Sequence, residues 1–222
     1  MERDWWRQPP YYYWWRDVTE LLPPGHGVCL DVGCGEGRQR EVVEARGYQW
    51  QGIDVTRRGP AEVPVGLIVD GRFPVADGIA DCLLCRQVLE HVEDLERFGA
   101  ECARALKPGG LIYGSSSWLE PGHDGGGSFS NLGHQGLSTL LRRHGFEVVT
   151  VEAGIHAGVL LVRSLLQDRW ASRLARAVAW AQRRADRREH QRPENAGVEG
   201  EALRKKQALR YAGHLLWVAR KR

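Results

Sequence analysis

Short apolar runs alternate with segments of helical periodicity along most of this chain. The alternation predicts an α/β fold in which right-handed crossovers build a mostly parallel sheet. Glycine or aspartate lies at or next to at least one end of each apolar run, as is typical of buried strands. These runs occupy 28–32, 50–55, 66–70, 79–85 and 111–115, and helical spacing of apolar residues is found in 38–46, 88–106 and 136–143.

The last third of the chain departs from this regular alternation. A strand is expected at 146–151 and another at 215–219. Between them, 164–192 reads as a helix with one apolar face and arginines around the remainder. Two interpretations stay open for that helix: a docking helix with a solvated basic face, or a helix that contacts an anionic lipid surface or carrier without inserting into a membrane.

The stretch 28–39 combines a strand with a glycine-rich turn. Apolar Val28, Leu30 and Val32 are followed by glycines at 33, 35 and 37. Glycine has no Cβ, so the backbone can take a positive φ and bring its amides against a ligand. The turn alone favours a nucleotide-type site, although glycines in such turns also serve packing.

The next acidic residue narrows that interpretation. Asp54 ends the second apolar run, about 20 residues beyond the first glycine, where a carboxylate can accept both ribose hydroxyls of an adenosine. A dinucleotide-dependent oxidoreductase is disfavoured because position 38, where its fingerprint needs a third glycine, is Arg.

Taken together, these residues resemble the class I S-adenosylmethionine-dependent methyltransferases, of the small-molecule type with a Leu-Glu-His signature. The resemblance covers about residues 25 to 120. It is carried by 30–37 (Leu-Asp-Val-Gly-Cys-Gly-Glu-Gly), Asp54, Asp70, 85–91 (Cys-Arg-Gln-Val-Leu-Glu-His) and 106–110 (Leu-Lys-Pro-Gly-Gly), in the family's order.

The resemblance implies a Rossmann-like three-layer sandwich. Its sheet has seven mostly parallel strands, with the last strand antiparallel between the fifth and sixth. One domain is expected over 1–222. It consists of an aromatic N-terminal cap (1–24) that covers a sheet edge or folds as a lid, a core (25–155), a basic helical insertion (156–210) and the last strand (211–222).

The resemblance also implies the ligand and its contacts. The cofactor is S-adenosyl-L-methionine, leaving as S-adenosyl-L-homocysteine, and Asp70 with Gly71 would contact the adenine. The expected cofactor-binding residues are Asp31, Gly33, Cys34, Gly35, Asp54, Val55, Asp70, Gly71, Cys85 and Arg86.

The expected reaction is O-methylation of a hydroxylated small molecule, such as a natural product or a sugar intermediate. In-line methyl transfer requires positioning and, for a hydroxyl acceptor, a general base. His123 and His134 are the candidate bases because they lie on the acceptor-side loop, and His91 is the alternative. C- or N-methylation remains an alternative, as does a cofactor-binding scaffold without catalysis.

Cysteines, charge and hydropathy exclude other classes of protein. The five cysteines fall inside expected strands, the glycine turn and a helix. Reduced thiols are therefore expected, and no metal site.

The two parts of the chain differ in charge. Residues 1–162 carry 15 basic and 22 acidic side chains, whereas 163–222 carry 16 basic and 6 acidic side chains. The excess of basic charge in 163–222 could contact phosphates, but 1–162 is acidic overall and the chain lacks the Asn-Pro-Pro-Tyr-like tetrad of base-methylating relatives, so no nucleic-acid partner is expected. No apolar run is long enough to span a membrane, so we expect a cytoplasmic protein, monomeric or homodimeric, with a small-molecule acceptor.

Overall fold

The computed structural model describes residues 18–58, 65–120, 128–155 and 212–222, with isolated positions at 157–158, 160–161, 174, 177–178, 181 and 209. Residues 1–17 of the expected cap, His123, and most of the expected basic helix at 164–192 lie outside the described residues. No helix in the described part of the chain is long and apolar enough to cross a membrane.

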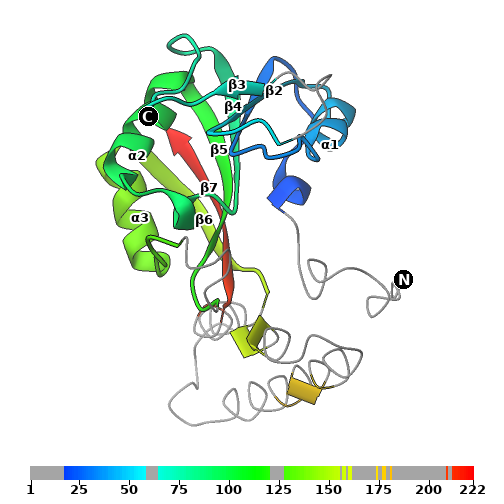
Figure 1. Cartoon of the computed structure of the whole chain (residues 1–222), viewed down its shortest axis with the longest axis vertical. Coiled ribbons are helices and arrows are strands. Elements are labelled where there is room, and N and C mark those ends of the chain that lie inside the picture. Colours follow the sequence, from blue (N-terminus) through cyan, green and yellow to red (C-terminus); the bar gives the residue numbers. More distant parts are fainter. Residues whose placement is uncertain are drawn as a thin grey trace, which may run out of the picture.

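Seven strands form one sheet in the order β3-β2-β1-β4-β5-β7-β6 (Figure 1). All neighbours pair in parallel except β7, which runs antiparallel to both β5 and β6. The strands are β1 (Val28–Val32), β2 (Gln49–Asp54), β3 (Val65–Leu67), β4 (Ala80–Arg86), β5 (Leu106–Ser117), β6 (Phe146–Ala153) and β7 (His214–Lys221). The expected seven-stranded sheet, with its last strand antiparallel between the fifth and sixth, is therefore confirmed.

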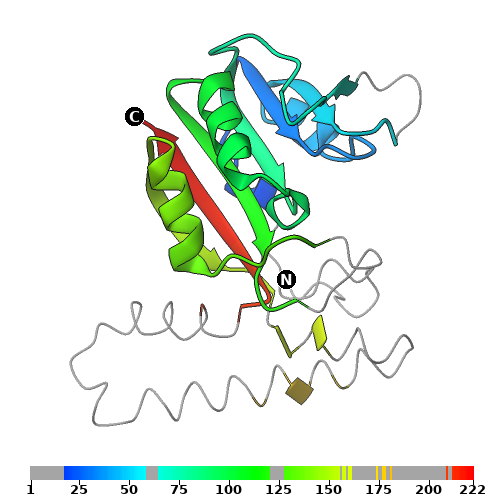
Figure 2. The same ribbon diagram turned by 60° about the vertical axis from the view of Figure 1, so that its left-hand side comes forward.

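Helices cover both faces of the sheet, which gives the three expected layers (Figures 1 and 2). α2 (Leu95–Ala105) and α3 (His134–Arg143) pack on one face, and α1 (Arg40–Ala45) packs on the other with the 3₁₀ turn η3 (Val18–Leu21). Successive strand residues alternate between the two cores. Leu83 belongs to the core under α2 and α3, whereas Leu84 belongs to the core under α1.

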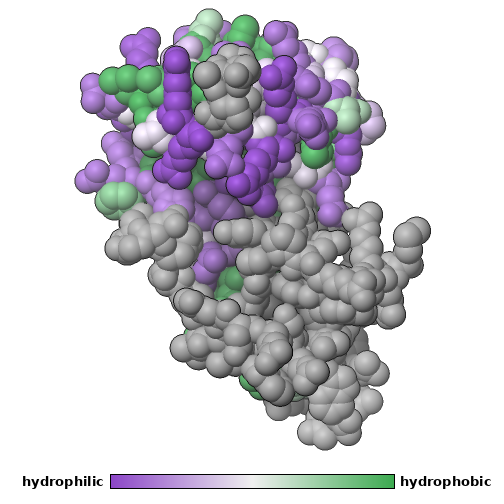
Figure 3. Space-filling view, turned by 45° about the vertical axis from the view of Figure 1, so that its right-hand side comes forward, coloured by the Kyte–Doolittle hydropathy of each residue, from purple (hydrophilic) through white to green (hydrophobic). Residues whose placement is uncertain are grey.

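All five cysteines are free and buried. Cys82 and Cys85 lie in the two opposite cores, so this Cys-x-x-Cys pair cannot converge on one ligand. Outside these cores, the described surface in Figure 3 is mostly hydrophilic, with small separate hydrophobic patches.

The expected helix at 88–106 is wrong at its N-terminal end. Residues Leu89–His91 form a short 3₁₀ turn (η4), Val92 is extended, and α2 begins only at Leu95. The carboxylate of Asp94 accepts a hydrogen bond from the Arg97 amide at 2.9 Å, which caps the helix there. A side-chain cap fixes the first turn, so the preceding motif residues remain outside the helix.

Two other boundaries also differ from expectation. β3 stops at Leu67, and an isolated bridge between Val69 and Arg72 closes a turn at the expected strand end. α2 ends at Ala105, but Leu106 already belongs to β5, and the pairing register with β4 shifts across 106–111. The Lys-Pro-Gly-Gly stretch is therefore a bulge within a strand, not a separate loop.

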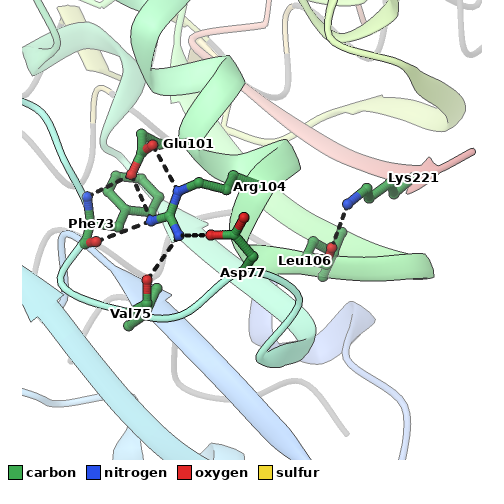
Figure 4. Close-up of polar contacts among 7 residues, drawn as sticks. All are labelled: Phe73, Val75, Asp77, Glu101, Arg104, Leu106 and Lys221. Atoms are coloured by element: carbon green, nitrogen blue, oxygen red, sulfur yellow. Dashed lines mark hydrogen bonds and ion pairs between the residues drawn. The ribbon is translucent and has the colours of Figure 1, made fainter.

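A side-chain contact joins the last strand to the start of β5. Lys221, near the end of β7, donates a hydrogen bond to the Leu106 carbonyl at 2.7 Å (Figure 4).

Candidate functional site

A cleft of about 1170 Å³ opens at the carboxyl ends of β1, β2 and β4. Ligands of open α/β sheets bind at this edge, since the loops after parallel strands meet there. A second hollow of about 240 Å³ adjoins it at the glycine turn, and both are lined by Gly33, Gly35 and Arg58. The residues expected to bind a cofactor that line one or both are Asp31, Gly33, Cys34, Gly35, Asp54, Val55, Asp70, Gly71 and Arg86.

Cys85 is the expected residue that lines neither hollow. Its side chain is fully buried in the core under α2 and α3. A hydrogen bond with Cys102 and burial both raise the pKa of the Cys85 thiol well above its ordinary value. A role for Cys85 in ligand contact is therefore restricted to its main chain.

The glycine turn needs its glycines for two different reasons. Gly33 has a φ of 69°, and a Cβ there would lie 2.6 Å from Cγ2 of Val88, so both conformation and space require glycine. Gly35 has a φ of 56°, but a Cβ there would meet nothing within 4 Å, so only its conformation requires glycine. The open space beside Gly35 belongs to the cleft.

Asp54 joins the glycine turn to the end of β2. Its Oδ2 accepts the Gly35 amide hydrogen at 2.8 Å, and its Oδ1 accepts the Thr56 amide hydrogen at 3.2 Å. The side chain is buried yet lines the cleft. Since each carboxylate oxygen has two lone pairs, Asp54 can still accept two further hydrogen bonds from a ligand.

The turn after β3 forms another wall of the cleft. Asp70 and Gly71 both have positive φ, 49° and 69°, and the ring of Phe73 behind them packs edge-on against Phe98 at 5.8 Å. Apolar Val55 and Ile68 line the cleft beside this turn. Acidic and apolar groups are thus placed as an adenine-like base requires, with polar contacts at its edge and apolar contacts on its faces.

A guanidinium and a carboxylate on α2 hold this wall in place (Figure 4). Glu101 accepts the Phe73 amide hydrogen at 2.8 Å, while Arg104 donates to the carbonyls of Phe73 at 3.1 Å and Val75 at 2.8 Å. Arg104 also pairs with Asp77 at 2.7 Å and with Glu101 at 2.8 Å. The hydrogen bond from Arg104 lowers the pKa of Glu101, and its acidic partners raise the pKa of Arg104. The wall of the cleft is therefore fixed to α2, whose inner face packs in the core.

Asp31 and Cys34 lie at the smaller hollow. Asp31 is almost fully buried and accepts a hydrogen bond from the Trp50 indole at 3.0 Å. Burial and the nearby carboxylates of Asp31 and Asp54 raise the pKa of Cys34 to about 12, so its thiol stays protonated near neutral pH. In the described part of the chain, no group of three or more His, Cys, Asp or Glu side chains is placed to hold a metal ion.

The three candidate histidines differ in what the structure shows of their position relative to the cleft. His91 is exposed and lines the cleft. His134 begins α3 outside the cleft lining, with its ring 5.7 Å from that of Trp118, and its buried Nδ1 has no hydrogen-bond partner among the described residues. His123 lies outside the described residues. Of the two candidate histidines that the structure describes, His91 lines the cleft and His134 does not.

A polar cluster beyond the end of β5 was not predicted from the sequence. It links Gln87, Glu90, Ser117, Glu120 and His214 through side-chain contacts. The predicted topology did contain one indication of this cluster. An antiparallel last strand begins at the edge of the sheet where its parallel neighbours end, and the start of β7 therefore lies beside the end of β5. In the structure His214 pairs with Ser117 there. No local spacing connects residues 90 and 214, however, so sequence pattern alone did not group them.

Comparison with known proteins agrees with this architecture. Residues 30–114 match the methyltransferase domain family. An uncharacterized methyltransferase of Mycobacterium sp. strain JLS is 36% identical over 138 residues, covering 58% of this chain and 54% of that protein. The ubiquinone biosynthesis O-methyltransferase of Rhizobium johnstonii is 38% identical over 109 residues, covering 44% of each chain. The chain thus spans about half the length of these relatives.

Solved structures share the fold over most of the chain. The [4+2]-cyclase SpnF superimposes with a TM-score of 0.58 at 23% identity, covering 92% of this chain and 79% of that one. Because that protein is a cyclase, this likeness identifies the fold and leaves the chemistry to the site.

Proposed function

We propose that this chain, which belongs to the class I S-adenosylmethionine-dependent methyltransferases, binds S-adenosyl-L-methionine in the cleft and transfers its methyl group to a hydroxylated small molecule. The observation that carries the proposal is the convergence of the glycine turn, Asp54 and the Asp70–Gly71 turn on one cleft. These three features come from three separate strand ends and match the three parts of the cofactor.

Each part of the cofactor has a proposed contact. Asp54 would accept the ribose hydroxyls, since both its oxygens retain acceptor capacity. Asp70 and Gly71 would contact the edge of the adenine, between apolar Val55 and Ile68. The methionine part would lie along Gly33–Gly35 toward the smaller hollow. There, Asp31 and Arg86 offer one negative and one positive group to its ammonium and carboxylate.

Methyl transfer itself demands little covalent chemistry from the protein. The acceptor's lone pair attacks the methyl carbon while the carbon–sulfur bond breaks and its electron pair goes to sulfur. Holding the two reactants aligned in a cleft that excludes water can supply much of the acceleration. A hydroxyl acceptor is favoured because the Rhizobium relative is an O-methyltransferase by name. Natural products and sugar intermediates are the proposed acceptor class.

Calorimetry tests the cofactor first. S-adenosylmethionine and S-adenosylhomocysteine are expected to bind with one site per chain, and NAD⁺ is expected not to bind. Tight binding of NAD⁺ without binding of S-adenosylmethionine would overturn the proposal.

An acceptor screen with methyl-labelled cofactor tests the reaction. Hydroxylated, amine and carbon-acid compounds are offered in parallel, and label is expected on oxygen. Label on nitrogen or carbon would move the proposal to N- or C-methylation. Cofactor binding without transfer to any compound would favour a scaffold or a reaction of another kind on the same fold.

A further inference from the structure

Arg58 lies where the two hollows of the candidate site meet. The cleft at the strand ends and the smaller hollow beside it are both lined by Gly33, Gly35 and Arg58. Because glycine has no side chain, Arg58 is the only residue with a side chain among the described residues that line both. It is exposed to solvent. A ligand that occupies both hollows therefore passes beside Arg58.

A series of hydrogen bonds connects Arg58 to the glycine turn. Asp54 accepts the Gly35 amide hydrogen through Oδ2 at 2.8 Å and the Thr56 amide hydrogen through Oδ1 at 3.2 Å. The hydroxyl of Thr56 in turn accepts a hydrogen bond from Nε of Arg58 at 3.1 Å. The loop after β2 is thus tied to the turn after β1, and the bond at Nε restricts the orientation of the guanidinium.

The terminal nitrogens of Arg58 retain their capacity to donate hydrogen bonds. A guanidinium carries several N–H groups, and only one of them is on Nε. Within the described part of the chain, the two terminal nitrogens of Arg58 make no hydrogen bond and no ion pair. Parallel N–H groups of a guanidinium bind a carboxylate in a bidentate manner. The side chain of Arg58 is therefore suited to an anionic group of a ligand.

The lining of the smaller hollow contains more guanidinium than carboxylate groups. Arg38, Arg58 and Arg86 line it together with Asp31 and Glu36. Oε2 of Glu36 accepts hydrogen bonds from Nε and Nη2 of Arg38 at 2.9 and 2.7 Å, so these two exposed side chains neutralise each other. Arg58 and Arg86 then stand against Asp31 alone, and the resulting positive excess favours an anionic group in this hollow.

Only the methionine part of the proposed cofactor carries an anionic group, its carboxylate. The adenine and the ribose are assigned to the larger cleft, at the Asp70–Gly71 turn and at Asp54, so the methionine part must pass Arg58 to enter the smaller hollow. The sulfonium is positive, and a guanidinium directly beside it would repel it. Arg58 should therefore face the carboxylate end of the ligand, away from the sulfur.

We propose that Arg58 binds the carboxylate of S-adenosylmethionine through its terminal nitrogens, and that Thr56 is a positioning residue that holds Nε of Arg58. The inference deepens the proposed function and rests on it. Arg86 comes from the end of β4, and Arg58 adds a second cation from the loop after β2. The carboxylate is then held from two strand ends, which fixes the direction in which the methionine part enters the smaller hollow.

Calorimetry with two ligands that differ only in the carboxylate tests this contact in the full chain. S-adenosylmethionine and its decarboxylated form are titrated separately, the weaker ligand in competition with S-adenosylhomocysteine. Arg58→Ala is expected to bind S-adenosylmethionine about tenfold more weakly, because a charge-assisted contact is lost. It is expected to bind the decarboxylated form at least as tightly as the original protein does. Equal losses for both ligands, or no loss for either, would overturn the assignment.

Two further variants separate this contact from a general effect on the loop. Arg57→Ala removes the neighbouring exposed arginine, which lines neither hollow, and should bind both ligands like the original protein. Thr56→Val removes the hydroxyl that accepts from Nε of Arg58 but keeps the amide that donates to Asp54. It should reduce the preference for S-adenosylmethionine over the decarboxylated form about threefold. An unchanged preference would remove Thr56 from the positioning role.

A second pair of ligands tests which end of the methionine part Arg58 faces. S-adenosylmethionine and S-adenosylhomocysteine share the carboxylate, but only the first has a positive sulfur. Arg58→Ala should therefore weaken both ligands by the same factor. Tighter binding of S-adenosylmethionine alone would place Arg58 beside the sulfur and overturn the inference. Failure of the original protein to bind either ligand would instead contradict the proposed function itself.

Discussion

Oδ2 of Asp54 lies 2.8 Å from the amide nitrogen of Gly35, so the carboxylate at the end of β2 holds the glycine turn that follows β1. The two residues are 19 positions apart, and their strands are parallel neighbours. One carboxylate thus shapes the turn and lines the cleft. Loss of Asp54 should therefore affect a ligand both directly and through the turn.

Asp54→Ala should weaken the binding of S-adenosylmethionine by roughly 2 kcal/mol or more, because the proposed charge-assisted contact to the ribose would be lost together with the contact to the Gly35 amide. Calorimetry measures the affinity. Glu41→Ala, which removes an exposed acid from α1, is the control and should bind normally. Unchanged affinity in a folded Asp54→Ala protein would contradict the assignment of the ribose site.

Arg104→Ala should reduce cofactor affinity about fivefold, roughly 1 kcal/mol, without any contact between Arg104 and the ligand. The guanidinium fixes the main chain at Phe73 and Val75, and its loss frees that wall of the cleft. Arg104→Lys should recover part of the affinity, since an ammonium keeps the charge but cannot make the same set of contacts. Arg143→Ala breaks an exposed ion pair with Glu96 and should bind like the original protein. Equal affinity in all three variants would show that the wall needs no such support.

The free energy of unfolding should decrease as pH rises above about 9. Burial raises the pKa of Cys34 from 9.0 to about 12 and that of Tyr113 from 10.0 to about 12, so the folded protein keeps protons that the unfolded chain releases. This contribution is fully present below pH 9 and is lost progressively up to about pH 12. Urea unfolding with a reducing agent should show a loss of about 1 kcal/mol between pH 8 and 10. Constant stability over that interval would contradict the burial of these groups.

Asp94→Ala should destabilise the protein by about 1 kcal/mol, because the Arg97 amide at the start of α2 loses its side-chain acceptor. Urea unfolding at neutral pH measures this. Asp94→Ser should retain most of the stability, since serine also caps helices. A helix that began at residue 88 would make Asp94 an interior position, and both substitutions would then have little effect.

The local sequence was sufficient to predict the order of the strands, the glycine turn and most of the residues that line the cleft at the strand ends. Gly33, Gly35, Asp54 and Asp70 each stand at the end of an apolar run, and parallel strands necessarily bring such ends together. The start of α2 was misjudged because the apolar spacing of 88–106 continues through the motif. The Asp94 cap that stops the helix is a single polar residue without periodicity.

Tertiary structure alone decided which side chains support the cleft and which lie behind it. In the sequence nothing distinguishes Arg104 from other arginines on helices. Only the fold places the carbonyls of Phe73 and Val75 within hydrogen-bond distance of its guanidinium. Glu90 and His214 are 124 positions apart, and only the insertion of β7 beside β5 joins them through Ser117 and Glu120. Sequence pattern records periodicity and turn chemistry, which are local, whereas a shared hydrogen bond depends on packing between distant segments.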